Sequence, residues 1–492
     1  MKKYVLSLIA FTMTTGPALA GGILTNTNQS VLFLKNPARD AAIGLDGVYS
    51  NPAGVAFMPE GFHIAFNWQY AHQTRTITTT NPSFALGKKN GGNDTKTFEG
   101  VADAPIIPSL QGAYNKGNWS LQFNLSVPGG GGSCEFSDGL GSFESVVGNI
   151  AAMLQPLGAQ GYDMESYMKG RQYYFGIQLG AAYKITPDLS VYGGLRLLYG
   201  DATYKAKISN IMVKTDGGYV GFADYLQYSA TTINNALDLV NGGIAQYEAA
   251  GMDAPADLLM QQAQLEGTRE SLNQLQKYAD GVNLLCNQDG VGIAPIIGID
   301  YRVGRFNFAA KYEFKTQIRM KNESTVNEAS EIAAVNKFRD GEKVNEDQPA
   351  LLSLGAQWKP VDVVAINLGW HHYFDKDASW YNNSQNLLSH NTNEFLAGVE
   401  WDVTPRLNVS MGGQLTRYGM SDEYMSDMSF VVNSYSLGLG FSYKVTDKVT
   451  LSAAYFQTNY GDYERKNYPT AGVNDTFTRT NRVLGVGCQL DF

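Results

Sequence analysis

The sequence predicts an all-β fold: a transmembrane barrel of about 14 antiparallel strands, with an N-terminal hatch that plugs it and helices in its extracellular loops. Three observations lead to this prediction. Short segments alternate between apolar and polar residues, short turns join these segments in pairs, and the chain ends on a phenylalanine, Phe492. Alternation indicates strands because successive side chains of a strand point to opposite faces of the sheet.

The end of the chain shows the alternation best. In Ser434–Tyr443 (SYSLGLGFSY) every odd position is apolar or aromatic, and every even position is a serine or a glycine. The turn Lys444–Lys448 follows, and the pattern resumes at Val449. Such strands offer one face to lipid and one to a wet lumen, as in bacterial outer membranes. We expect the barrel assembly machinery of that membrane to bind the end at Phe492.

Aromatic residues close many strands just before a short turn, as at Tyr183, Trp358 and Trp401. Tyr and Trp are amphipathic and favour the membrane–water interface. The turns pair the second strand with the third, the fourth with the fifth and so on, which leaves a single strand at each end of the chain. The strand number is therefore even, as expected of such barrels.

The composition favours this class over a helical membrane protein or a nucleic-acid-binding protein. The chain has 492 residues, of which 53 are glycine and 29 tyrosine, and only 17% are charged. Its mean hydropathy of -0.22 is too low for membrane helices, which need about 20 consecutive apolar residues each. The formal net charge of -9 argues against nucleic acid as a partner.

Residues 1–20 have the three parts of a secretory signal peptide. Lys2 and Lys3 precede the apolar run Val5–Met13, and the small residues Ala18-Leu19-Ala20 form a cleavage site. The apolar run is too short to span a membrane. We therefore expect cleavage and export to the cell envelope.

The rest of the chain divides into two parts. Residues 21–60 are polar and lack clean alternation, which favours an ordered hatch inside the barrel, and residues 61–492 make the barrel. The expected strands span roughly 61–74, 106–115, 118–127, 172–185, 189–206, 292–303, 305–318, 349–359, 362–375, 392–403, 406–419, 430–445, 447–463 and 480–492. The expected long extracellular loops cover about 75–105, 128–171, 207–291 and 319–348.

Two of these loops show helical spacing of their apolar residues, within 143–154 and 258–282. The Gly242-Gly243 pair predicts a break between two helices in the longer loop, and Asp253 with Pro255 suits the start of the second. An apolar stripe on a loop needs a cover. Helices that pack on each other, a docking groove for apolar ligands and a partner-binding surface are all open alternatives.

The strand pattern turns several charged side chains into the lumen. Asp300, Lys311, Glu313, Glu394 and Glu400 fall on the lumen-facing side of their strands. We interpret them as a hydrated network that lines the barrel.

The cysteines and histidines give no sign of a metal site. Cys134, Cys286 and Cys488 are too few for a disulfide scaffold. Cys134 and Cys286 fall in loops predicted on the same oxidising side, so a disulfide between them and two free thiols are both open. His371 and His372 lie on opposite faces of one strand and cannot share a metal. We expect no metal, no cofactor and no enzymatic activity.

Residues Tyr49–Ala56 read YSNPAGVA. The tripeptide Asn51-Pro52-Ala53, shortly before the first strand, resembles the hatch signature of the outer-membrane long-chain fatty acid transporters, the FadL-type family. Three further segments agree with that family: Val127-Pro128-Gly129 at the end of the third strand, Tyr204–Ile208 (YKAKI) near the end of the fifth, and Pro349-Ala350-Leu351 at the start of the eighth. The resemblance covers essentially the whole mature chain.

The resemblance implies a monomeric outer-membrane channel that transports long-chain fatty acids or similar hydrophobic compounds without an energy source. Extracellular loops would capture the ligand, and the hatch would shift to release it. The hatch residues are Asn51, Pro52, Ala53 and Gly54. The ligand would leave through a lateral gap at a kink in the third strand, which we place at Gly129, Gly130, Gly131 and Gly132, where a flexible loop start is the other interpretation.

In that family a basic side chain near the end of the fifth strand meets the ligand carboxylate. The YKAKI resemblance assigns this role to Lys205, with Arg196, which faces the lumen by parity, as the second candidate. A cation opposite a carboxylate is chemically sensible. A solvated lumen lysine is the plainer alternative.

Two other functions stay open. A general diffusion porin would admit small polar solutes, but residues 21–60 and the Asn51-Pro52-Ala53 signature favour a hatch over an open pore. A surface adhesin or receptor would use the helical loops, and deletion of residues 232–284 would then abolish partner binding and spare uptake. For a transporter of this family, fatty acids, aromatic hydrocarbons and other lipophiles are all consistent ligands.

Overall fold

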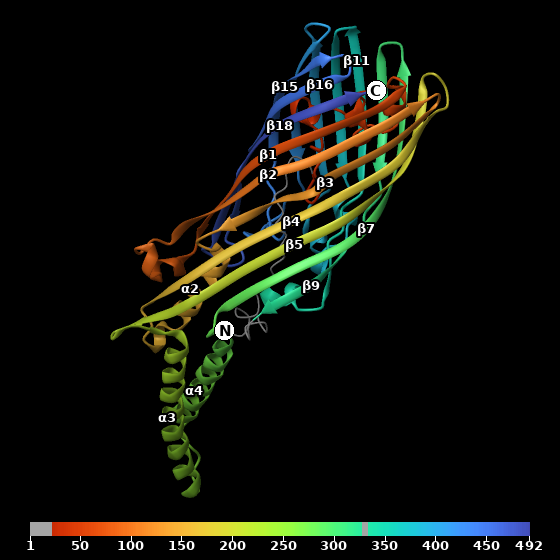
Figure 1. The fold of residues 1–492 in the computed structure, drawn as a ribbon. Helices are drawn as coiled ribbons and strands as arrows, with labels where there is room; N and C mark the ends of the chain where they lie inside the picture. The colour runs from red at the N-terminus through yellow and green to blue at the C-terminus, as the bar shows by residue number, and fades with distance from the viewer. Residues whose placement is uncertain (1–21, 327–332) are drawn as a thin grey trace.

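The computed structural model describes residues 22–326 and 333–492. Their strands form one antiparallel sheet that closes on itself, because β1 (Gly61–Thr80) pairs with β18 (Asn474–Asp491) along its length. Figure 1 shows a tall barrel of strongly tilted strands, with the C-terminus at the end opposite the long helices. The predicted signal peptide, residues 1–20, lies outside the described residues.

Fourteen long strands make the wall in the described part of the chain, and six short turns join them as predicted. Between β1 and β18 these strands are β2 (Thr95–Lys116), β3 (Trp119–Phe136), β4 (Gly161–Lys184), β5 (Leu189–Thr215), β7 (Val282–Val303), β8 (Phe306–Glu313), β11 (Leu351–Val361), β12 (Val364–Tyr373), β13 (Thr392–Asp402), β14 (Leu407–Arg417), β15 (Ser434–Thr446) and β16 (Val449–Tyr460). Four short strands add to their ends: β6 (Gly218–Gly221), β9 (Arg319–Val326), β10 (Lys343–Asn345) and β17 (Tyr463–Lys466).

The outer face of the barrel is apolar, which confirms the predicted alternation. Leu437 and Leu439 of β15 are each 60% exposed, whereas Ser436 is 2% exposed. Aromatic rings gather beside the short turns, and those of Trp119 and Tyr183 lie 4.7 Å apart. An apolar surface of this extent is favourable only in contact with lipid. The wall is therefore that of an outer-membrane barrel.

The strands reach further toward the long-loop end than predicted. β1 continues to Thr80 instead of residue 74, and β4 begins at Gly161 instead of residue 172. In these extensions the outward side chains are polar: the hydroxyls of Thr78 and Thr97 lie 3.0 Å apart across β1 and β2. Where a sheet leaves lipid its outward face can be polar, so the pattern of apolar outward residues ends although the strand continues.

Three α-helices belong to the long loops in the described residues: α2 (Gly141–Met153), α3 (Phe222–Ala249) and α4 (Ala256–Leu275). α3 and α4 form a hairpin that projects from the barrel in Figure 1. None of the described helices is long and apolar enough to cross a membrane.

The predicted helix break at Gly242-Gly243 is wrong, because α3 runs through both glycines and the chain turns only after Ala249. A glycine inside a helix costs about 1 kcal/mol relative to alanine. Gly243 also faces α4, where an added Cβ would lie 3.4 Å from Leu258. Packing against α4 therefore outweighs the low helix propensity of the pair.

An arginine on the outer face tests the lipid contact. Leu439→Arg should lower the free energy of unfolding by about 2–4 kcal/mol, because it places a cation in hydrocarbon. The measurement is urea unfolding of the protein folded into lipid vesicles. Thr78→Arg is the control, since Thr78 lies in the polar extension of β1, and it should change that free energy by at most about 0.5 kcal/mol. Equal losses in the two variants would contradict this lipid boundary.

Candidate functional site

The N-terminal segment, residues 22–60, lies inside the barrel, and most of its residues are buried. Its helix α1 (Val31–Lys35) packs against β15, β16 and β18. There the ring of Phe33 lies 5.9 Å from the ring of Phe456, centroid to centroid. The segment therefore occupies the lumen, and its polar contacts with the wall fall into separate groups.

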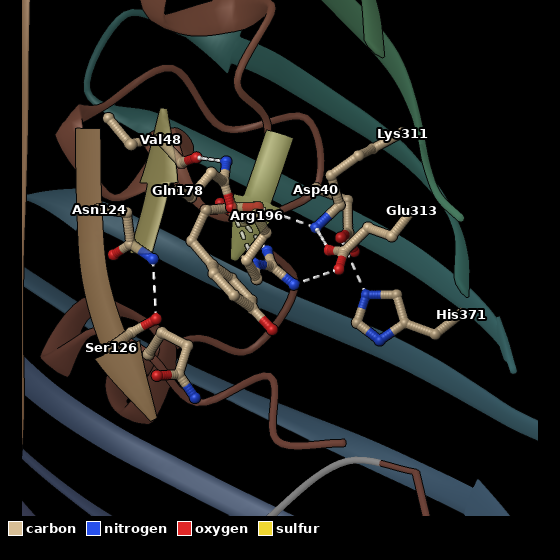
Figure 2. A network of polar contacts seen from close by, with 12 residues as sticks. Asp40, Val48, Asn124, Ser126, Gln178, Arg196, Lys311, Glu313 and His371 are labelled. Carbon is tan, nitrogen blue, oxygen red and sulfur yellow. Dashed lines mark hydrogen bonds and ion pairs between the residues drawn. The ribbon is translucent and has the colours of Figure 1, made fainter. Parts of the chain in front are cut away.

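The first group joins Asp40 of the segment to β12 and β13. Nε2 of His371 lies 2.9 Å from the Asp40 carboxylate, and Nδ1 lies 3.0 Å from the Glu394 carboxylate (Figure 2 shows His371 beside Asp40). The Tyr373 hydroxyl donates to Glu394 at 2.8 Å. A doubly protonated imidazole donates through both nitrogens, so His371 can bind both carboxylates at once.

The second group surrounds Arg39. Its guanidinium binds Asp46 of the same segment with hydrogen bonds of 2.7 and 3.0 Å, and it also binds Glu400 of β13. Nearby, Nζ of Lys35 donates to the Asn408 side chain at 2.5 Å. Burial lowers the pKa of Lys35 to about 8, and Glu400 opposes part of that shift. Bidentate arginine–carboxylate pairs hold one geometry, so this group orients the segment as well as binding it.

The third group is built on Arg196 of β5, which faces the lumen as its parity predicted. Its guanidinium pairs with Glu313 of β8 and donates to the side-chain oxygen of Gln178 at 2.6 and 3.1 Å. The Gln178 amide in turn donates to the carbonyl of Val48 at 2.9 Å, as Figure 2 shows. Arg196 thus supports a residue that binds the N-terminal segment.

Tyr49 lies between two cations of this group. Its ring centroid is 4.7 Å from the guanidinium carbon of Arg196 and 4.8 Å from Nζ of Lys311. Lys311 also donates to the Tyr49 carbonyl at 2.8 Å and to Glu313 at 2.6 Å. A desolvated cation–π contact contributes about 2 kcal/mol, so Tyr49 ties the segment to both strands.

The predicted hatch signature binds three strands. Nδ2 of Asn51 donates to the Asp300 carboxylate of β7 at 2.6 Å. A Cβ at Gly54 would lie 2.3 Å from that nitrogen and 2.9 Å from Asp300, so a larger residue would displace the Asn51–Asp300 pair. The two carbonyls between them are also bound, by Gln122 of β3 at 2.7 Å for Pro52 and by Ser190 of β5 at 2.6 Å for Ala53.

The wall has a break in its hydrogen-bond ladder between β2 and β3. Pairing holds up to Leu110↔Leu125 and resumes only at Asp103↔Ser133. Pro105, Pro108 and Pro128 fall inside this interval, and proline has no N–H for a ladder. The prolines of both strands therefore account for the break.

The four glycines lie on the β3 side of this break. Gly130 and Gly131 have φ of +65° and +115°, a region that residues with side chains rarely adopt. The register of β3 against β4 shifts on either side, between Ser126 and Gly129 and between Gly130 and Gly132. β3 nevertheless continues to Phe136, so the glycines bend a strand and do not start a loop.

The N-terminal segment covers the break from inside. The Asn26 amide donates to the Pro128 carbonyl at 2.9 Å, and its side chain donates to the Gly130 carbonyl at 2.6 Å. Gln29 exchanges two hydrogen bonds of 3.0 Å with the backbone of Val127. These bonds supply partners to backbone groups of β3 where β2 does not pair with them.

Toward the long-loop end the inner wall becomes apolar. One cluster of buried apolar side chains, here called the outer cluster, joins inward residues of β1–β5, β7, β9 and β18 to α2 and to loop residues 418–432. Its largest members include Phe84, Phe98, Phe136, Phe143, Tyr162, Tyr174, Tyr204, Met320, Phe338, Trp380, Met425, Met428, Phe430 and Phe477. Aromatic and methionine side chains of this kind form adaptable apolar sites.

No family model matches the chain, and no curated protein matches it. Solved structures do. A Pseudomonas aeruginosa FadL homologue aligns with a TM-score of 0.62 at 12% identity, over 96% of this chain and 100% of that one. The Pseudomonas putida toluene transporter TodX gives 0.52 at 12%, over 91% and 94%. The Ralstonia pickettii toluene transporter TbuX gives 0.51 at 13%, over 94% and 98%. The chain has the FadL-type barrel fold.

In this FadL-type barrel Lys205 does not face the lumen, so its predicted contact with a ligand carboxylate is wrong. Its neighbours Tyr204 and Ala206 are 0% and 4% exposed and point inward, whereas Lys205 is exposed on the outer face. Lys205 lies beside Lys169 of β4 and Leu285 of β7. The inward alternation persists through this polar stretch, which gave no hydropathy signal of its facing.

The disulfide between Cys134 and Cys286 is also absent, and these two thiols are free. Both point inward on one row of the sheet, Cys134–Gly170–Tyr204–Cys286 across β3, β4, β5 and β7. Three strand spacings amount to roughly 14 Å. A disulfide needs Cα atoms about 4.4–6.8 Å apart, so the wall itself separates the pair.

Sequence reasoning assigned the inward charges to a hydrated network, and the structure corrects that role. Asp300, Lys311 and Glu313 are at most 5% exposed, and with Glu394 and Glu400 they contribute to the contacts of the N-terminal segment. The contact between His371 and Asp40 was not predicted. The sequence carried a signal only for the contact of His371 with Glu394. These two are facing residues of adjacent strands, and both point inward.

Removing the shared carboxylate of the third group tests how the segment is held. Glu313→Gln leaves Arg196 and Lys311 charged without it, and breaking a buried charge network costs about 3–5 kcal/mol. A cysteine replacing half-buried Ser50, in a chain otherwise free of cysteine, should then react with a water-soluble maleimide at least about tenfold faster. Glu323→Gln, an exposed position on β9, is the control and should leave the rate unchanged. Equal rates in both variants would show that this group does not hold the segment.

Proposed function

We propose that this protein is a passive outer-membrane channel for long-chain fatty acids or similar hydrophobic compounds. Capture takes place at the extracellular loops, and the N-terminal segment acts as a hatch that gates release. The observation that carries the proposal is the outer cluster: the lumen is apolar and aromatic between the loops and the N-terminal segment. A general porin needs a water-filled lumen, which this arrangement does not favour.

The fold supports the class of function. TodX and TbuX are described as toluene transporters, and the Pseudomonas aeruginosa protein as a FadL homologue. Their likeness to this chain lies in the barrel, so the ligand has to be argued from its own side chains. Transport of this kind makes and breaks no covalent bond and needs no cofactor.

The ladder break between β2 and β3 supports a lateral exit. In the described structure Asn26 and Gln29 bind β3 at this place with the four hydrogen bonds given above. Movement of the segment would free the backbone of β3 and open a path from the lumen into the bilayer. A hydrophobic ligand would follow that path down its own concentration gradient, because lipid solvates it better than water.

The barrel is proposed to act as a monomer and to be delivered by the barrel assembly machinery. The C-terminal Phe492 pairs with Phe62 through backbone bonds of 2.9 and 3.3 Å, and their rings lie 6.2 Å apart. The terminal residue thus becomes part of the closing seam once the barrel is complete.

Ligand binding tests the proposal directly. The purified mature protein in detergent should carry apolar compounds that mass spectrometry identifies, and it should bind a fluorescent fatty acid that unlabelled long-chain acids displace to saturation. We expect this binding because the acyl chain of the ligand would be buried in the outer cluster, which contributes about 0.8 kcal/mol per methylene. Absence of apolar binding, together with free swelling of protein-bearing liposomes in sugars, would identify a porin and overturn the proposal.

A disulfide between α1 and β18 tests the hatch. A Cβ at Gly487 would lie 2.7 Å from Cγ1 of Val31, so cysteines at these two positions can bridge with small adjustment. In a chain otherwise free of cysteine, oxidation of Val31→Cys/Gly487→Cys should reduce fatty acid uptake at least about tenfold, and reductant should restore it. Each single variant under the same oxidant is a control. Undiminished uptake with the bridge formed would show that release does not need α1 to move.

A further inference from the structure

Three lysine side chains gather on the outer face of β4 and β5, here called the lysine patch: Lys169 of β4 with Lys205 and Lys207 of β5. Lys169 and Lys205 are facing residues of the two strands, and Lys207 is the next outward residue along β5. All three point away from the lumen, because Tyr204 and Ala206 between them are at most 4% exposed and belong to the outer cluster inside the barrel. The lysine patch therefore lies on the outside of the barrel, where its strands extend toward the long loops.

The lysine patch carries positive charge that no carboxylate pairs with. Nζ of Lys169 lies 2.7 Å from the Glu135 carboxylate. Lys205 and Lys207 are exposed, and within the described part of the chain neither has an acidic partner closer than 4.0 Å. Like charges that face each other on neighbouring strands repel, as Lys169 and Lys205 do. An anion bound above them would lower their energy.

Other carboxylates on the outer face of these strands have partners of their own. Asp201 of β5 binds Arg171 of β4 at 2.6 Å. Glu165 of β4 accepts a hydrogen bond from the Asn210 side chain at 2.8 Å. Neither carboxylate is bonded to Lys205 or Lys207, so an anionic ligand has two ammonium groups to bind here.

The same extension has a different chemistry on β1 and β18. Its outward residues there are threonines: Thr74, Thr76, Thr78 and Thr80 on β1, and Thr476, Thr478 and Thr480 on β18. The hydroxyls of Thr74 and Thr480 lie 2.6 Å apart across the two strands. This surface is neutral, so the positive charge of the lysine patch is not a general property of the extended strands.

The height of the lysine patch above the lipid indicates the size of the head group that can reach it. Tyr199, 44% exposed, is the last aromatic outward residue of β5 before the charged Asp201. Lys205 lies six residues beyond Tyr199, which is about 20 Å along the strand and about 14 Å in height for a tilt of about 45°. The head-group layer of a phospholipid adds only about 5–8 Å to each side of the hydrocarbon. A lipid that binds the lysine patch therefore needs a larger head group.

A polar cleft of about 300 Å³ adjoins the lysine patch. Lys207 and its facing residue Tyr167 line it, together with Lys88 and Lys89 of the loop between β1 and β2. Carboxylates line it as well, and one of them, Asp163, is bound by Lys88 at 2.8 Å. Hydroxyls both donate and accept hydrogen bonds, so this mixed lining suits the sugar rings of a glycolipid. The volume is at the lower end of those of small-molecule sites.

We propose that the lysine patch binds a phosphate group of an outer-leaflet glycolipid, whose acyl chains lie against the apolar outer face and whose sugars reach the cleft. The long loops of such a barrel face the cell exterior, and phosphorylated glycolipid forms the leaflet on that side. Lysine binds phosphate through charge-assisted hydrogen bonds. The lysine patch lies outside the lumen, so this proposal does not depend on the channel function given above.

The test titrates the purified protein in detergent with rough lipopolysaccharide, which consists of lipid A and inner-core sugars, and measures bound glycolipid by native mass spectrometry. The wild type should bind it at least about tenfold more tightly than the same glycolipid without its phosphates, because charge-assisted hydrogen bonds are then lost. Lys205→Gln/Lys207→Gln should abolish this preference and leave binding of the dephosphorylated glycolipid unchanged. Displacement of a fluorescent fatty acid should be the same in the variant as in the wild type.

Two further variants are controls. Lys444→Gln/Lys448→Gln removes two exposed lysines from a short turn at the opposite end of the barrel and should keep the preference. Lys205→Arg/Lys207→Arg retains both charges and should keep it as well. A wild type that binds both glycolipids equally, or a preference that survives in Lys205→Gln/Lys207→Gln, overturns the proposal. Binding of phosphatidylglycerol as tight as that of the phosphorylated glycolipid overturns the choice of a glycolipid as the ligand.

Discussion

Inside a bilayer every backbone amide of this chain must find its partner within the wall, and the pairing of β1 with β18 meets that requirement. Once the sheet is closed, its alternation divides all side chains between lipid and lumen. Everything that the barrel holds then depends on its inner face. The ladder break between β2 and β3 meets the same requirement in another way, because Asn26 and Gln29 supply hydrogen-bond partners there from within the lumen.

The N-terminal segment is held by charged and polar bonds to the wall as well as by the apolar packing of α1. Arg39, Asp40 and Asn51 each bind an acid or a histidine of a different part of the barrel. A buried ion pair adds little net stability relative to its solvated parts, but it demands one geometry. Such contacts suit the proposed hatch, because water could take over each partner when the segment moves.

The lumen has two chemically distinct levels. Around the N-terminal segment ionic and polar contacts accompany apolar packing, and toward the loops the outer cluster is aromatic and rich in methionine. Arg75 and Arg479 lie beside Phe430 of the outer cluster.

The sequence by itself determined the class of fold, the strand number and the facing of residues within lipid. The reason is that the free energy of transfer from water to hydrocarbon is a property of each single side chain. Leu439 outward and Arg196 inward both follow from parity. Beyond the lipid, as around Lys205, hydropathy no longer indicates which face a residue occupies, although the strand continues. Only the tertiary structure decided which inward residues meet. Cys134 and Cys286 are kept apart by three strand spacings. Arg75 and Arg479 meet because closure of the barrel joins β1 to β18.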